Sequence, residues 1–377
     1  MARNKLAALD KKFLKRELVV TNRTAPGITK RGTIDLISFS CNDYLGLSQH
    51  PEVIRAAKDA TELLGAGAGA SRHITGNHAL YQDLESKLAS LKNTEDAVVF
   101  GSGYLANIGT IPALVSEPDL IVMDEACHAS LHAGVRLARS RIISFSHNDE
   151  SNVIALLKKH RDKHRYCLLL TEGVFSMDGD RAPISKLLEI ATEYDAWLMT
   201  DDAHGLGVVG GGRGSNVEAN KTIPVPLQMG TLSKSIGTYG GYLCANRTVT
   251  NLIRNRARSL IYTTGLPPGT VAAATKALEI IMSDERLVKK PLDNAQLFTE
   301  ILGLPSAQSA IVPLQIGSSE RVLKLSKTLQ KKGYLVVAIR PPTVPEGTAR
   351  LRCTFSAAHR KEDVEAFAST LKKALGA

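Results

Sequence analysis

Short apolar runs alternate with amphipathic segments through the middle of the chain, and this alternation is the feature that most constrains the fold. The runs have strand length and occupy residues 97–100, 120–123, 142–145, 167–170, 196–199 and 242–245. The segments between them have helical spacing; in 185–194, Leu187, Ile190 and Tyr194 fall on one face. Strands that alternate with helices form a mostly parallel sheet with helices on both sides. The sequence therefore predicts an α/β fold.

The two ends of the chain have other patterns. Residues 3–19 have near-helical apolar spacing, 21–33 have loop composition, and a strand-like run follows at 34–40. After the proline pair at 267–268 the pattern predicts a helix at 269–282, strands near 311–316 and 334–339, and helices near 319–332 and 361–375. We therefore expect an N-terminal arm (1–45), a large domain (46–267) and a smaller C-terminal α+β domain (268–377).

Composition excludes several classes of protein. The net charge of +10 is spread along the chain and aromatic residues make up only 5%, which disfavours nucleic-acid binding. The charge fits simple solubility, or attraction of an anionic substrate or an acidic carrier protein. The five cysteines are widely spaced, without a C-x-x-C pair, as expected in the cytosol. The first 18 residues lack the apolar core of a signal peptide, and no apolar run approaches the ~18 residues of a membrane span.

The residues best suited to ligand binding or catalysis lie in the stretch 195–242. The strand-like run 196–199 leads to Asp201 and Asp202, and Lys234 follows in a Thr-x-Ser-Lys-Ser context rich in glycine. A G-x-G-x-x-G lies between them at 205–210, but a dinucleotide site needs a helix at these glycines and an acid about 20 residues further on. Neither follows, so we reject a nicotinamide or flavin site. An isolated lysine is usually a surface residue, whereas this context favours contact with a bound molecule.

Four segments resemble the α-oxoamine synthase family of fold-type I pyridoxal 5′-phosphate (PLP) enzymes. They are TEGVFSMDGD (171–180), DDAHGLGVVG (201–210), TLSKSIGTYGGY (231–242) and RPPTVPEGTARLR (340–352), and the resemblance extends from about residue 38 to 359. It implies the PLP-dependent transferase fold, PLP as cofactor, and a homodimer with active sites between the subunits. It also implies an acyltransferase that joins an amino acid to an acyl thioester with loss of CO2.

The resemblance of these segments implies L-alanine and a pimeloyl thioester as substrates, with the thioester on CoA or acyl carrier protein, in biotin biosynthesis. The alternatives within the family are glycine with acetyl-CoA, glycine with succinyl-CoA, and serine with a fatty acyl-CoA. A non-catalytic binding protein on the same scaffold would be favoured if Lys234, Asp201 or His204 were missing, and all three are present.

The resemblance also implies the contacts of the cofactor. Lys234 would form the covalent link, Asp201 (with Asp202 as the neighbouring alternative) would face the pyridine nitrogen, and His204 would bond the phenolic oxygen. His128 would stack on the ring, and Ser176 would touch the cofactor or its amino acid. Without the resemblance, His204 and Ser176 would be read as turn residues. The phosphate would contact Ser102, Gly103 and Tyr104 at a predicted helix start, Thr231, and Thr263 or Thr264 of the partner subunit.

Substrate contacts are implied in the same way. Arg352 would bind the carboxylate of the amino acid, Thr343, Asn42 and His128 would face the substrate, and Arg16 or Arg23 would contact the acyl group. Asn42 alone would predict only a turn. Tyr81 stands where the family commonly has histidine. His132 follows His128 by four residues, but no third ligand accompanies them, so we predict no metal site.

Overall fold

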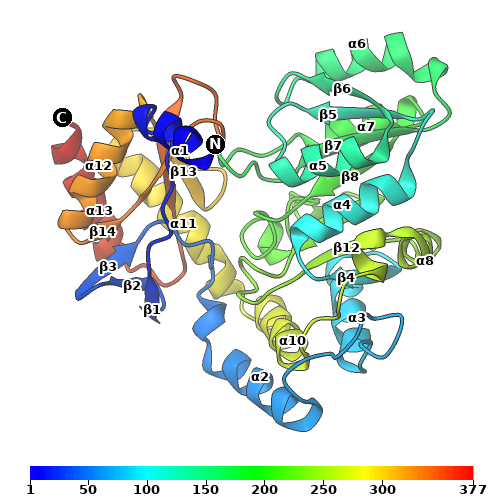
Figure 1. The fold of residues 1–377 in the computed structure, drawn as a ribbon, viewed down its shortest axis with the longest axis horizontal. Coiled ribbons are helices and arrows are strands. Elements are labelled where there is room, and N and C mark those ends of the chain that lie inside the picture. Colours follow the sequence, from blue (N-terminus) through cyan, green and yellow to red (C-terminus); the bar gives the residue numbers. More distant parts are fainter. Residues whose placement is uncertain (377) are drawn as a thin grey trace. The chain divides into compact units, whose positions relative to one another are not determined.

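The computed structural model describes residues 1–376, which form two compact units (Figure 1). Unit 1 consists of Met1–Gly46, Ser176–Gly179 and Lys290–Ala377, and unit 2 of Leu47–Phe175 and Asp180–Lys289. The helix α10 (Pro268–Ser283) packs against α2 (Pro51–Leu64) and α3 (Leu80–Lys92), so it belongs to unit 2 rather than to the C-terminal part of the chain. The three-part division made from the sequence stays a prediction.

Unit 2 is built on a seven-stranded sheet of order β4-β12-β11-β8-β7-β5-β6. The strands are β4 (Asp96–Phe100), β5 (Leu120–Asp124), β6 (Arg141–Phe145), β7 (Cys167–Glu172), β8 (Trp197–Asp201), β11 (Leu227–Thr231) and β12 (Gly241–Ala245). β12 runs antiparallel to both of its neighbours, β4 and β11, and the pairs from β11 to β6 are all parallel, so the predicted mostly parallel sheet is confirmed. β11 was not predicted, because Gln228 and Gly230 interrupt its apolar pattern.

Helices cover both faces of this sheet, as can be followed in Figure 1. One hydrophobic cluster joins alternate strand residues such as Met123 and Met229 to α4 (Gly103–Leu114), α5 (Ala129–Ala138) and α8 (Arg247–Arg256). A second joins the intervening residues to α6 (Glu150–His160) and α7 (Ile184–Glu193). The period-2 alternation of a strand explains why one strand supplies both clusters. Unit 2 also contains α9 (Arg258–Ile261), the hairpin β9 (Val217–Glu218) and β10 (Lys221–Thr222), and the turns η1 (Leu47–Gln49), η2 (Arg161–Lys163) and η3 (Gly210–Gly212).

Unit 1 contains two small sheets around a core of stacked aromatic rings. One sheet has the order β1-β2-β3-β14 and the other β13-β16-β15. Their strands are β1 (Asn22–Ala25), β2 (Ile28–Arg31), β3 (Ile34–Ser38), β14 (Tyr334–Leu335), β13 (Ile311–Gly317), β16 (Ala349–Thr354) and β15 (Val337–Ile339), and the helices are α12 (Ser319–Lys331) and α13 (Lys361–Leu375). Phe39 and Phe298 both stack on Phe367 in the core. The helix α11 (Glu285–Leu302) begins in unit 2 and ends in unit 1.

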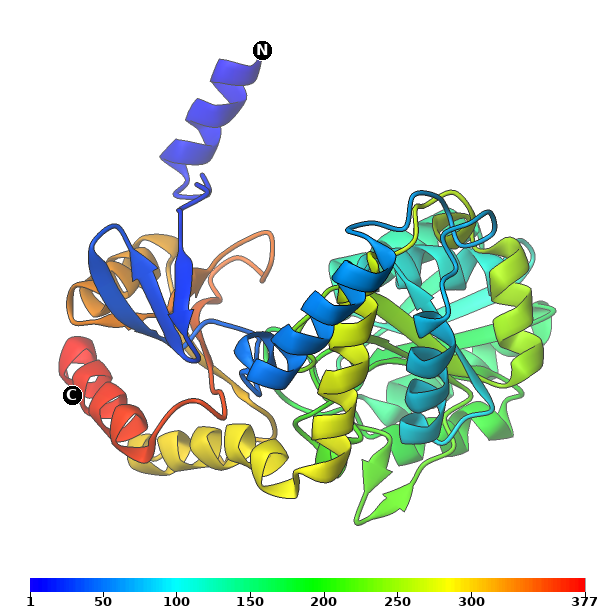
Figure 2. The same cartoon turned by 90° about the horizontal axis from the view of Figure 1, so that it is seen from below.

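The N-terminal region differs from the prediction in the length of its helix and in the structure of residues 21–33. The helix predicted over 3–19 is shorter than expected: it is α1 (Ala2–Lys11). It ends there because the backbone leaves the helical region at Phe13, which has φ 57°. No residue of α1 is buried, and it stands away from the rest of unit 1 (Figure 2). The segment 21–33, expected to be a loop, contains the β1–β2 hairpin, in which Pro26 and Gly27 form the turn.

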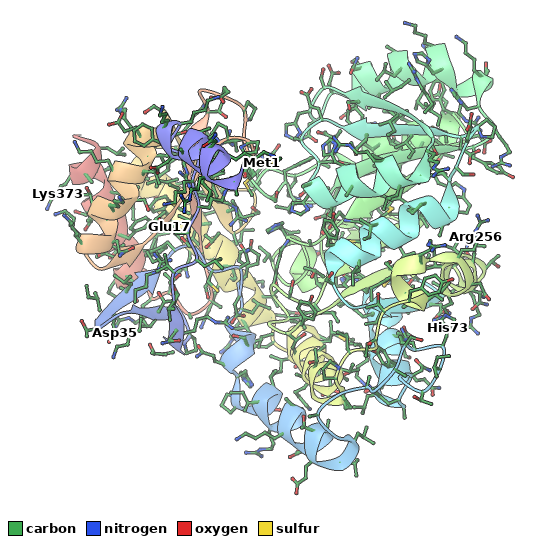
Figure 3. All side chains as sticks on the ribbon, viewed as in Figure 1. Met1, Glu17, Asp35, His73, Arg256 and Lys373 are labelled. Atoms are coloured by element: carbon green, nitrogen blue, oxygen red, sulfur yellow. The ribbon has the colours of Figure 1, made fainter. Side chains whose placement is uncertain are left out.

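Charged side chains lie on the surface of unit 1. Asp35 on β3 and Lys373 on α13 are exposed and point away from the core of unit 1, as Figure 3 shows. None of the helices within residues 1–376 has the length and apolarity that crossing a bilayer would require.

Candidate active site

Polar side chains gather where the strands of the unit 2 sheet end. β8 ends at Asp201 and β11 ends at Thr231. Ser102 follows β4, and His128 follows β5. The carboxyl ends of parallel strands lie along one edge of a sheet, which is where open α/β sheets bind their ligands.

Asp201 is held in a fixed orientation at this edge. Its side chain is buried, with the residue 4% exposed. The backbone N–H of Ala203 donates to Oδ1 at 3.1 Å, and the amide Nδ2 of Asn107 donates to Oδ2 at 2.8 Å. Asn107 lies on α4 and was not predicted. The signal that could have found it is a polar residue within an otherwise apolar helix, GYLANIGTIPAL.

Asp202, the alternative to Asp201, has a different partner. Lys92 is fully buried, and its ammonium group lies 2.7 Å from Asp202 Oδ2. The same ammonium group donates to the carbonyl of Arg213 and to Asn216 Oδ1, while the hydroxyl of Ser215 donates to Asp202 Oδ1 at 2.6 Å. Asp202 therefore ties the 213–216 loop to α3, which supports Asp201 as the residue that faces a ligand.

Replacing Lys92 with methionine tests this assignment. The change would leave the Asp202 carboxylate buried without a counter-ion, so we expect the free energy of unfolding to fall by about 3–5 kcal/mol. Urea unfolding of wild type, K92M and K92M/D202N measures it. The double variant should recover part of the loss because it removes the unpaired charge. A K92M protein as stable as wild type would show that the ion pair does not hold the loop.

Lys234 lies beside His204. The lysine Nζ is 2.8 Å from His204 Nε2, and His204 is buried three residues after the end of β8. The charges of both Asp201 and Lys234 act on His128. Unit 2 thus brings together the four predicted catalytic residues.

His128 is the N-cap of α5. Its Nδ1 accepts from the backbone N–H of Ser130 at 3.2 Å and lies 2.7 Å from the Ser130 hydroxyl. Burial lowers the pKa of His128; the negative charge of Asp201 opposes this effect and the positive charge of Lys234 adds to it. The ring is therefore neutral at pH 7. Among residues 1–376, no group of three or more histidine, cysteine or acidic side chains is arranged to hold a metal ion.

The predicted phosphate contacts meet at the start of α4. This helix begins at Gly103, and the hydroxyl of its N-cap, Ser102, accepts from the N–H of Leu105 at 3.1 Å. A Cβ at Gly103 would lie 3.4 Å from Thr231 Oγ1, and a Cβ at Gly241 would lie only 2.5 Å from the Ser102 carbonyl oxygen. β12 therefore starts with glycine where it passes this turn. Tyr104 is half exposed, so its contribution would be its backbone N–H.

Thr263 and Thr264 lie in a segment held by Tyr81. The Tyr81 hydroxyl accepts from the N–H of Leu266 at 2.5 Å, and the Arg72 guanidinium lies 3.9 Å from the centre of the Tyr81 ring. Thr264 also forms a single β-bridge with Ser71. Tyr81 therefore anchors the segment that carries these threonines.

Unit 1 brings together three predicted site residues, Arg352, Asn42 and Ser176. Arg352, on β16, is 7% exposed; its Nε donates to the carbonyl of Ser176 at 2.5 Å and its Nη1 donates to Asn42 Oδ1 at 3.0 Å. Its Nη2 also reaches the hydroxyl of Tyr44 at 3.5 Å, a residue that the sequence analysis missed. All these acceptors are neutral, and no carboxylate within residues 1–376 pairs with Arg352. A buried guanidinium without a counter-ion suits an anionic ligand.

The two N-terminal arginines have different neighbours. Arg16 Nη2 donates to Thr343 Oγ1 at 3.2 Å, which joins it to a predicted substrate contact. Arg23 instead lies 3.4 Å from the Asp43 carboxylate.

A second charged cluster surrounds His147. Its Nδ1 lies 3.1 Å from Asp124 Oδ1, and its Nε2 lies 2.8 Å from Asp180 Oδ2. Hydrogen bonds to these two carboxylates raise the pKa of His147 from 6.5 to about 10. The imidazolium ion therefore bridges β5 and the segment that follows Gly179.

This cluster predicts a pH dependence of stability. The pKa of His147 is higher in the folded state, so its stabilisation is complete below about pH 6.5 and is lost as the pH rises through about 10. The side chain is 29% exposed, so after allowance for screening we expect a loss on the order of 1–2 kcal/mol. Urea unfolding between pH 6 and 10.5 measures it, with His147→Gln as the control that lacks this contribution. Parallel pH profiles of the two proteins would contradict the assignment.

Comparison with known proteins agrees with this geometry. Residues 34–371 match the class I and II aminotransferase family. The chain therefore belongs to that family of PLP-dependent enzymes, and its α/β fold is the fold of the family. An 8-amino-7-oxononanoate synthase from Granulibacter bethesdensis is 55% identical over 374 residues, which cover 99% of this chain and 97% of the relative.

Solved structures show the same fold. A serine palmitoyltransferase variant from S. paucimobilis with bound PLP–myriocin aldimine is 28% identical, with a TM-score of 0.93, and the match covers 99% of this chain and 96% of that one. An 8-amino-7-oxononanoate synthase from Francisella tularensis is 24% identical, with a TM-score of 0.77 over 90% of this chain and 98% of that one.

Proposed function

We propose that this chain condenses L-alanine with a pimeloyl thioester to give 8-amino-7-oxononanoate, CO2 and free thiol, a step of biotin biosynthesis. Relatives at 50–55% identity over nearly the whole chain carry the name 8-amino-7-oxononanoate synthase. The observation that carries the proposal is the Lys234 amine, 2.8 Å from His204 Nε2, in the same cluster as the buried Asp201 carboxylate.

The residues of unit 2 fit PLP as cofactor. Lys234 would hold it covalently, Asp201 would pair with the pyridine nitrogen, and His204 with the phenolic oxygen. The start of α4 and Thr231 would hold the phosphate, because unpaired N–H groups and the helix dipole favour an anion there. Bound PLP supplies a ring that withdraws electrons and stabilises negative charge at the α-carbon of the amino acid.

The side chains of unit 2 would then divide the remaining tasks. The Lys234 Nζ, beside His204 Nε2, would take the proton from the α-carbon of alanine. Asp201 would place its carboxylate group in a buried position, where a charge acts strongly. His128 presents a neutral ring whose Nδ1 accepts two hydrogen bonds from Ser130, so it covers a ligand without adding positive charge.

Unit 1 would bind the substrate carboxylates. Arg352 lacks an anionic partner within residues 1–376 and is oriented by Asn42 and the Ser176 carbonyl, so it would pair with the carboxylate of alanine. Arg16 would contact the pimeloyl group together with Thr343, because these two side chains already share a hydrogen bond. Arg23 is the weaker candidate, since its charge is paired with Asp43.

The partners belong to the same proposal. We infer a homodimer in which Thr263 or Thr264 reaches the phosphate of the other subunit, as the family resemblance implies. The net charge of +10 favours an anionic acyl donor, and both CoA and acyl carrier protein are anionic.

Thiol release measured with a panel of amino acids and thioesters tests the function. We expect L-alanine with a pimeloyl thioester to give the highest kcat/KM, with the CoA and carrier-protein forms assayed in parallel. Highest activity with glycine and acetyl-CoA, glycine and succinyl-CoA, or serine and a fatty acyl-CoA would assign another reaction of the same fold. No turnover with any pair would favour a binding protein.

A further inference from the structure

Asn107 joins two of the proposed site residues. It is fully buried on α4. Its amide nitrogen Nδ2 lies 2.8 Å from Asp201 Oδ2 and 3.0 Å from Ser130 Oγ. An amide nitrogen has two hydrogens to donate, so both are used in these contacts.

The orientation of this amide is set by Asp201. With the amide reversed, Oδ1 would face the carboxylate and two acceptors would meet. In the observed orientation, Asn107 Oδ1 has no hydrogen-bond partner among residues 1–376. A buried acceptor without a partner costs about 1–3 kcal/mol. Packing alone would favour an apolar residue here, so the two donors are what the asparagine provides.

The hydrogen bond from Asn107 gives the Asp201 carboxylate a donor on its second oxygen. Oδ1 accepts from the Ala203 N–H and Oδ2 accepts from Asn107. One donor on each oxygen fixes the plane of the carboxylate. Each oxygen keeps further acceptor capacity, which is what a protonated ring nitrogen of a ligand requires.

On the Ser130 side, the contact reaches His128. Ser130 Oγ accepts from Asn107, so its own hydrogen is available for His128 Nδ1 at 2.7 Å. The proton of the neutral imidazole is then on Nε2. α4 and α5 pack closely enough to hold this chain of bonds, because a Cβ at Gly134 would lie 2.8 Å from the Asn107 carbonyl oxygen.

We propose that Asn107 is a positioning residue of the cofactor site, which holds the Asp201 carboxylate and the His128 ring as one hydrogen-bonded unit. This inference rests on the proposed PLP-dependent function. Gly103 precedes Asn107 by four residues and so lies on the same face of α4. One face of α4 therefore carries both Gly103, at the proposed phosphate site, and Asn107, which donates to the Asp201 carboxylate.

The variant Asn107→Leu tests the proposal, because it keeps the size of the side chain and removes both donors. We expect the dissociation constant of PLP for the apoprotein to rise about 10–100-fold, by analogy with the loss of affinity when a hydrogen-bond partner of a metal ligand is removed. The ring nitrogen of ¹⁵N-labelled PLP should be protonated in wild type at pH 7 and less so in N107L. A change of protonation would not follow from a purely structural role.

Two controls separate this effect from altered packing. Thr110 lies on the same helix, is fully buried, and its hydroxyl has no partner within residues 1–376, so T110V should bind PLP like wild type. S130A removes the hydroxyl that contacts His128 but keeps the hydrogen bond from Asn107 to Asp201. The signal of the PLP ring nitrogen in S130A should therefore match that of wild type. If N107L fails to fold, N107D replaces it: binding should be weaker at pH 7 and recover relative to wild type as the pH falls, because a protonated Asp can donate to Asp201.

The outcomes of these experiments separate the role of Asn107 from the proposed PLP-dependent function. Folded N107L that binds PLP within twofold of wild type, with an unchanged ring-nitrogen signal, would overturn the role of Asn107. If N107D is used instead, a pH profile parallel to that of wild type would overturn it. Wild-type protein that binds no PLP at Lys234 would overturn the proposed function itself.

Discussion

Replacing Lys234 with alanine is expected to abolish turnover while leaving the protein folded. In our account the ε-amino group is both the point of covalent attachment and the base that takes the α-proton, so its removal takes away both roles at once. Steady-state assays of thiol release, with circular dichroism to check the fold, measure the effect.

Lys234→Arg is the matched control. It keeps a positive charge beside His204, but a guanidinium group stays protonated and cannot act as a nucleophile or a base. We expect K234R to be as inactive as K234A. Wild-type turnover in either variant would remove Lys234 from the reaction.

Replacing Asp201 with asparagine is expected to lower kcat by about 10²–10³-fold or more, in the range found when one preorganised electrostatic contact of a site is removed. The amide keeps the shape of the carboxylate but loses the charge that would hold a proton on the pyridine nitrogen. Single-turnover assays at saturating PLP separate this effect from weaker cofactor binding.

Asp202→Asn provides the comparison for this result. Asp202 pairs with the buried Lys92, so D202N should reduce the free energy of unfolding more than D201N does and should affect the chemical step less. A merely twofold loss in D201N, with a large loss in D202N, would exchange the roles of these neighbours.

The central sheet could be predicted because its strands are buried on both faces and form continuous apolar runs. β11 could not, since Gln228 and Gly230 break its pattern and only the pairing with β8 and β12 makes it a strand. The end of α1 could not be predicted either, because the residue in the left-handed conformation there is Phe13 rather than a glycine.

Some residues of the candidate site could be predicted from the sequence and others could not. Lys234, His204 and Asp201 stand in motifs, so they could be named from the sequence. Asn107 and Tyr44 act through contacts with residues 94 and 308 positions away in the chain, and no local pattern records such contacts. The preference for Arg16 over Arg23 likewise came from the tertiary contact with Thr343.

The most direct test of the account is to locate the cofactor on the chain. Protein incubated with PLP is reduced with borohydride, digested, and analysed by mass spectrometry, with K234A treated in parallel. The account predicts one stoichiometric adduct, on the peptide that contains Lys234, and no adduct in K234A. A stoichiometric adduct on a different lysine, or none on the wild-type protein, would contradict it.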